Sequence, residues 1–91
     1  MSDLEATRQL GRDLAAELDA LNADIRNAER VMRFHRLPEA AVRIGHRSAL
    51  SWRRGRLWID GPRKSVELVH APRRVRVAAA DLLPQLVRRN R

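Results

Sequence analysis

An apolar seam with heptad spacing in the first third of the chain most constrains what this sequence can fold into. Its members follow one another at alternating intervals of four and three residues: Leu14, Leu18, Leu21, Ile25, Ala28 and Met32. The same frame extends backwards, more weakly, through Gly11 and Thr7 to Leu4. This spacing predicts a helix with one continuous apolar stripe, which must pack against something.

The helix is expected to run from about Asp3 to Phe34 without interruption. That stretch contains no proline, one glycine (Gly11), and mostly residues of high helix propensity. Ser2 is the expected N-cap, and Glu5 stands three residues later as its capping-box partner. Pro38 disfavours the helical conformation at the residue before it, so we place the boundary between a helical region, 1–36, and a second region, 37–91.

The expected length of this helix limits how it can pack. Thirty-two residues span about 48 Å at 1.5 Å per residue, whereas a compact chain of this size has a diameter near 30 Å. The helix must therefore project, break near Gly11, or pair with a second copy. Three interpretations stay open: a helix laid across its own sheet, a parallel or antiparallel homodimeric coil, and a helix that binds a different partner. The seam residues are the predicted oligomer or partner interface.

The second region alternates with period two, which predicts a small antiparallel sheet. Expected strands cover 42–44, 50–53, 56–59 and 65–69. Residues 73–77 alternate in the same way, with Arg74 and Arg76 outward, and a short terminal helix covers 78–89. Pro84 is tolerated in that last helix if Asp81 is its N-cap and the proline lies in the first turn. We therefore predict an α+β fold, with a long N-terminal amphipathic helix, a sheet of three to four strands and a short C-terminal helix.

Arg54 and Gly55 form a two-residue hairpin turn signal between two of these strands. In the resulting register Trp52 lies opposite Leu57, and Leu50 lies opposite Ile59, which gives one apolar face. Because neighbouring strand residues point to opposite sides, the other face receives the remaining side chains: Ser51, Arg53, Arg56 and Trp58.

Charge is divided unevenly along this basic chain, which has a net charge of +8. Residues 1–33 hold seven acidic and five basic residues, a net of −2, whereas residues 34–91 hold four and fourteen, a net of +10. Such asymmetry suggests that the first region serves assembly and the second an anionic partner. All but one of the basic residues are arginines, which suits phosphate recognition, although GC-rich coding produces the same bias.

The predicted contact face combines an aromatic ring with guanidinium groups, as single-stranded nucleic acid requires. Its candidate nucleic-acid-binding residues lie on the hairpin, on the following turn and on the strand 73–77: Arg53, Arg54, Arg56, Trp58, Arg63, Lys64, Arg74 and Arg76. In the competing interpretation Trp58 covers a second apolar layer and the arginines are solvated. The sequence thus predicts a non-enzymatic module that associates with DNA or RNA and is dimeric through its helix.

Several chemistries find no support in the residues. The chain has no cysteine, and His35, His46 and His70 do not stand at metal-ligand spacing. We expect no metal, no cofactor, no small-molecule substrate, no membrane span, and a cytoplasmic protein. A metal-independent ribonuclease of the toxin kind remains an alternative, with His46 or His70 and Glu67 as its acid–base groups.

Three stretches, 49–52, 57–59 and 76–86, resemble small uncharacterised phage and prophage proteins. The resemblance covers less than half of the chain and carries over no functional residue. It implies a further alternative, a mobile-element protein that binds and inhibits a host complex which itself handles nucleic acid. In that alternative the arginines meet an acidic protein surface, and the helical seam is a protein-binding surface.

Overall fold

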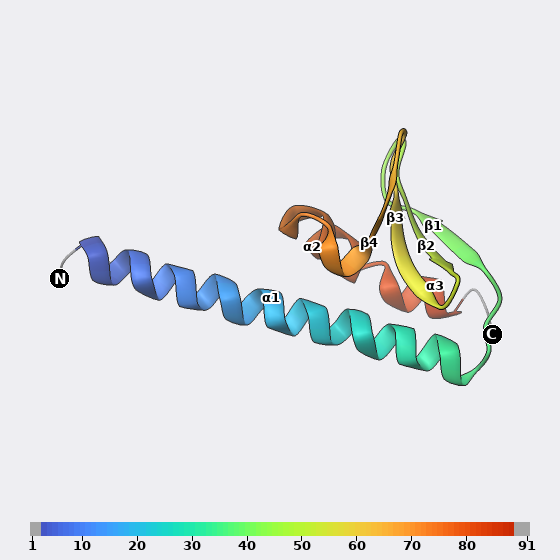
Figure 1. Ribbon diagram of the computed structural model, residues 1–91, viewed down its shortest axis with the longest axis horizontal. Coiled ribbons are helices and arrows are strands. Elements are labelled where there is room, and N and C mark those ends of the chain that lie inside the picture. The colour runs from blue at the N-terminus through green and yellow to red at the C-terminus, as the bar shows by residue number, and fades with distance from the viewer. Residues whose placement is uncertain (1–2, 89–91) are drawn as a thin grey trace.

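The computed structural model describes residues 3–88 and shows an α+β fold, as predicted (Figure 1). The elements follow in the order α1 (Asp3–Phe34), β1 (Ala40–Arg43), β2 (Ala49–Arg53), β3 (Arg56–Asp60), β4 (Ser65–Glu67), the 3-10 turn η1 (Leu68–His70), α2 (Arg73–Ala80) and α3 (Leu83–Arg88). The expected N-cap, Ser2, lies outside the described residues. Within residues 3–88, none of the helices combines the length and the apolar character that crossing a bilayer requires.

The helix α1 is unbroken and projects from the rest of the molecule (Figure 1). It passes through Gly11 without a break, and the molecule measures 52 × 29 × 18 Å, with its longest axis along the helix. The other elements gather beside its second half, and residues 3–17 are all exposed. We call the part formed by residues 37–88 the head.

The heptad seam is divided between a buried half and an exposed half. Ile25 and Met32 are 0 % exposed and belong to the core of the single chain, whereas Leu4 and Leu14 are 59 % and 38 % exposed. The interpretation of a helix laid across its own domain is therefore correct for the second half. Ile25 and Met32, predicted as interface residues, are corrected to core residues, because the head already covers this part of the stripe.

A tight reversal at the end of α1 places the sheet over the helix. Arg36 has a φ of 50°, and its N–H donates to the carbonyl of Arg33 at 3.0 Å. The Leu37 N–H donates to the carbonyl of Met32 at 3.0 Å, which completes a Schellman motif. Leu37 then packs against the core next to Met32, so the chain turns back along the helix that it has just left.

The four strands form an antiparallel meander in the order β1-β2-β3-β4. The predicted hairpin register is confirmed, with Trp52 opposite Leu57 and Leu50 opposite Ile59. One face of the sheet packs against the second half of α1 and against α3, and Trp52 donates its indole N–H to the Leu37 carbonyl at 3.3 Å. The core residues are Ile25, Met32, Val42, Leu50, Trp52, Leu57, Leu68, Ala71, Ala79, Leu83 and Leu86.

The predicted strand 73–77 is wrong, because these residues form α2. Pro72 is the N-cap of this helix, and the three alanines that follow Val77 favour its continuation. Val75 and Ala79 share its inner face at a spacing of four residues. The alternation covers only five residues, which is too short to distinguish the period of a strand from that of a helix.

The end of the chain also differs from the prediction. The strand expected over 65–69 stops at Glu67 and continues as η1. The single helix expected over 78–89 is divided into the end of α2 and a separate α3. Pro84 does lie in the first turn of α3, but Asp81 is the C-cap of α2 instead of the N-cap of the next helix.

Candidate functional site

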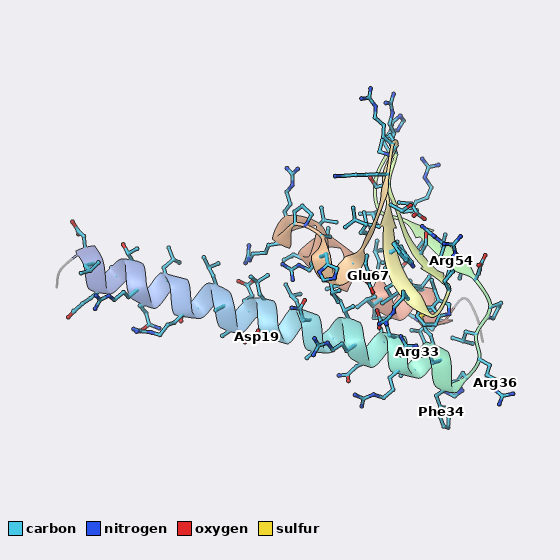
Figure 2. All side chains as sticks on the ribbon, in the orientation of Figure 1. Asp19, Arg33, Phe34, Arg36, Arg54 and Glu67 are labelled. Carbon is cyan, nitrogen blue, oxygen red and sulfur yellow. The ribbon has the colours of Figure 1, made fainter. Side chains whose placement is uncertain are left out.

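The hairpin tip between β2 and β3 is held by the end of α1. Arg54 and Gly55 both have positive φ angles, 54° and 72°, as a type I′ turn requires. Arg33 donates from Nε and from Nη2 to the Gly55 carbonyl, at 3.1 and 2.6 Å. Arg54 is exposed at this end of the molecule (Figure 2). The Arg54 guanidinium makes no ion pair with the described residues, whereas Arg33 also pairs with Glu29, at 3.4 Å between Nη2 and Oε2.

Trp58 lies on the predicted face, but its ring is covered. The Arg53 guanidinium stacks over the indole at 4.7 Å from the ring centroid, and the indole N–H donates to the Arg53 carbonyl at 3.2 Å. Arg53 also pairs with Asp60, at 2.8 Å between Nη2 and Oδ1. The Arg53 guanidinium therefore occupies a face of the Trp58 ring on which a base would otherwise stack.

Asp60 is the centre of the polar network on this face. It accepts hydrogen bonds from the Ser51 and Ser65 hydroxyls and from the Arg53 guanidinium. Partial burial alone would raise the pKa of Asp60, but these three hydrogen bonds and the positive charge of Arg53 outweigh it and lower the pKa. The network is a structural one that ties β2, β3 and β4 together.

Arg56 turns away from the open face toward α1. Its guanidinium lies 3.8 Å from Glu29, which is 5 % exposed, and 3.6 Å from Glu67. His70 Nε2 lies 3.6 Å from the other carboxylate oxygen of Glu67. These residues line a small polar groove of about 330 Å³ together with Arg26. The structure thus brings together His70 and Glu67, two residues of the ribonuclease alternative, whereas His46 lies in the β1–β2 loop and does not line the groove.

The predicted residues of α2 do not join the hairpin face. Arg76 lies against α1, and its Nη1 donates to the Asn22 side chain at 2.9 Å. Arg73, its neighbour in the first turn, pairs with Glu17. Of the two predicted residues on α2, only Arg74 is exposed, and it makes no ion pair within residues 3–88. The eight predicted residues therefore do not gather on one face, because residues 73–77 form a helix beside α1 instead of a strand in the sheet.

A different set of cations does gather, at the end of the sheet farthest from α1. Arg47, Arg63 and Lys64 line an open groove of about 510 Å³. Its floor is apolar, with Ile59, Val66, Ala71, Pro72 and Val75. None of its lining residues is acidic, and none of the three cations makes an ion pair within residues 3–88. We call this the cationic groove.

The meander explains why these cations meet. In an up-and-down sheet, alternate turns lie at the same end, so the β1–β2 and β3–β4 turns are neighbours. The first turn is closed by the Ile44 N–H on the Ser48 carbonyl, and the second by the Gly61 N–H on the Lys64 carbonyl, both at 2.9 Å. The sequence prediction included Arg63 and Lys64 but missed Arg47. In the observed strand order, the turn that contains Arg47 lies at this end.

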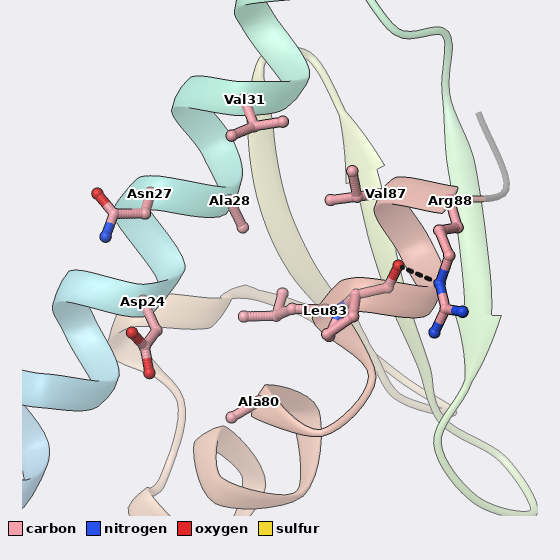
Figure 3. A pocket seen from close by; sticks show the side chains of 9 residues that line it. Asp24, Asn27, Ala28, Val31, Ala80, Leu83, Val87 and Arg88 are labelled. Carbon is pink, nitrogen blue, oxygen red and sulfur yellow. Dashed lines mark hydrogen bonds between the residues drawn. The ribbon is translucent and has the colours of Figure 1, made fainter. Parts of the chain in front are cut away.

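A second groove of about 650 Å³ runs between α1 and α3 (Figure 3). Its walls are largely apolar and include Val31 from α1 and Leu83 and Val87 from α3. Arg88 lies at its rim and donates to the Pro84 carbonyl at 3.4 Å. This groove offers contact area to an apolar group but lacks the cluster of cations that a polyanion requires.

The described part of the chain contains no group of three or more potential metal ligands among its His, Asp and Glu side chains. Comparisons with protein-family models, with curated proteins and with solved structures find no match to this chain.

Proposed function

We propose that this protein is a non-enzymatic module that binds nucleic acid through the cationic groove. The observation that carries the proposal is that three cations without an ion pair in residues 3–88, Arg47, Arg63 and Lys64, line one groove whose lining contains no carboxylate. Arg74, which is exposed in the first turn of α2, adds to the positive charge of the head. The proposal keeps the predicted class of partner and moves the contact surface from the hairpin face to the loop end of the sheet.

The groove fits a phosphate backbone better than it fits a specific base. Arginine and lysine side chains on two loops can contact successive phosphates, and the apolar floor can accept a sugar or the face of a base. The lining contains no aromatic ring and no buried polar group that would read a base edge. We therefore expect binding with little sequence preference and with a steep dependence on salt.

The proposal can be tested by fluorescence anisotropy with labelled single-stranded and double-stranded oligonucleotides. The groove variant combines Arg47→Ala, Arg63→Ala and Lys64→Ala. The matched control, Arg12→Ala with Arg30→Ala and Arg88→Ala, removes the same number of charges from exposed positions outside the groove. We expect the groove variant to lose at least ~10-fold in affinity and about two units of log–log salt slope. The control should lose less than about 3-fold.

Equal losses in the two variants would show that net charge alone attracts the polymer, and would overturn the proposed site. No binding to DNA or RNA at about 50 mM salt would overturn the function and leave the protein–protein adaptor. The same samples test the ribonuclease alternative, because RNA should remain intact. RNA cleaved to 2′,3′-cyclic phosphate ends, with the cleavage lost in His70→Ala, would replace the proposal by that enzyme.

A further inference from the structure

We propose that the exposed half of α1 is covered by the same segment of a second copy of this chain, in antiparallel orientation. The surface in question is the projecting stripe, formed by Leu4, Leu10 and Leu14, which are 59 %, 60 % and 38 % exposed. It continues the helix face that buries Ile25 in the core. Residues 3–17 are all exposed, and the other described elements gather beside the second half of α1 (Figure 1). This inference concerns a different surface from the cationic groove and does not depend on it.

The projecting part of α1, residues 3–17, would be only marginally stable in water as an isolated helix. Helix formation is cooperative, and most of the stability of a helix in a protein comes from packing. The projecting part also contains Gly11, which lowers helix propensity further. A partner that buries the three leucines would supply the missing packing. A second copy carries the same stripe, so an interface around a two-fold axis is self-complementary.

The shape of the molecule selects the antiparallel orientation. The head lies on the same side of α1 as the projecting stripe, because it buries Ile25 and Met32 on that face. The head begins beside Glu17, where Arg73 of α2 pairs with it. If the second helix ran parallel to α1, its residues after 17 would collide with α2 of the first copy. An antiparallel partner instead ends against the head, and its own head lies beyond the first turn of α1.

The positions along the stripe agree with this orientation. An antiparallel pairing that sets Leu4 against Leu14 of the second copy places Leu10 close to the two-fold axis. Gly11 lies on the same face, and nothing stands within 4 Å of where its Cβ would be. It would lie opposite Thr7 of the second copy, where a small residue lets the two backbones approach closely.

The charges also favour a second copy over an unrelated helix. The first turn of α1 carries two carboxylates, Asp3 and Glu5. In the antiparallel pairing this turn reaches the start of α2 in the other copy, where Arg73 and Arg74 stand. Arg73 already holds Glu17 there, so this position accepts carboxylates in the folded chain. The dimer then contains two such contacts, each between the acidic first turn of one copy and Arg73 and Arg74 of the other.

Cysteine cross-linking tests both the partner and the orientation, because the chain has no cysteine of its own. Chains with Leu4→Cys and chains with Leu14→Cys are oxidised separately and as a mixture. We expect cross-linked dimers in the mixture and few in either sample alone. Ala16→Cys, exposed on the opposite side of the helix, is the control and should not cross-link. Cross-linking of Leu4→Cys with itself would indicate a parallel pair and overturn the proposed orientation.

Sedimentation equilibrium of the unmodified chain gives an independent measurement. We expect a concentration-dependent dimer, and Leu10→Asp should raise the dissociation constant of the dimer at least ~10-fold. Ala16→Asp should leave the constant unchanged, and circular dichroism checks that both variants fold. A wild-type chain that stays monomeric at about 100 µM would overturn the proposal and assign the stripe to a different partner.

Discussion

Two alanine substitutions on one face of α1 test how this helix packs against the head. Ile25 and Leu10 lie on the same apolar stripe, but Ile25 is 0 % exposed and Leu10 is 60 % exposed. Replacing a fully buried isoleucine by alanine removes its transfer free energy and leaves a cavity, so Ile25→Ala should cost about 2–5 kcal/mol. Leu10→Ala should change the stability of the monomer by less than about 0.5 kcal/mol, since little of the side chain is buried.

The difference between these variants is large enough for a direct measurement. In a domain of this size, a loss of 3 kcal/mol corresponds to a decrease in Tm of roughly 12–24 °C. Urea and thermal unfolding, followed by far-UV circular dichroism at low micromolar concentration, give both values for the monomer. A similar cost for the two substitutions would refute the described packing of α1. So would a cost below about 1 kcal/mol for Ile25→Ala.

Two further substitutions test the sheet. Asp60→Asn should cost about 1–3 kcal/mol, because three hydrogen-bond donors lose a charged acceptor. In the folded chain the pKa of Asp60 lies below its ordinary value of 3.8, so its stabilisation is complete above that value and disappears as the pH falls through the lowered pKa. The stability of the wild type should therefore decrease more steeply in acid than that of Asp60→Asn, and parallel pH profiles would contradict this role. At the hairpin tip, Arg54→Asn should stabilise the chain by about 0.5–1 kcal/mol, because asparagine tolerates the positive φ better. Gly55→Ala should destabilise it by about 1 kcal/mol or more, although the new Cβ would meet Arg33 Nε at an acceptable 3.7 Å. Urea unfolding that showed the same sign for both substitutions would refute a type I′ turn at this position.

The long helix and the central hairpin could be predicted because their signals are local. The heptad spacing, the absence of proline before Pro38 and the Arg54-Gly55 turn each act over a few residues. The register of β2 and β3 then follows from the two-residue loop, which fixes the pairing on both sides. These elements form as expected because propensity, turn chemistry and apolar pattern all favour the same structure.

The region after β4 could not be predicted in the same way. The alternation in 73–77 fits both a strand and a helix over so short a stretch. The tertiary structure decides between them, because Val75 packs against the core and Arg76 bonds to Asn22 on α1. The extent of the buried seam was open for the same reason. Whether Ile25 packs on its own head or on another chain depends on where the head lies, and the heptad pattern is the same in both cases.

The position of the unpaired cations is also a consequence of the tertiary structure. The net charge of +10 after residue 33 suggested a basic region separate from an acidic helix. In the folded chain, carboxylates of α1 reach into that region, where Glu29 lies near Arg56 and Glu17 pairs with Arg73. These partners are 27 and 56 residues apart in the sequence, so local patterns do not reveal them. The cationic groove lies at the end of the sheet farthest from α1, where neither of these two carboxylates reaches (Figure 1).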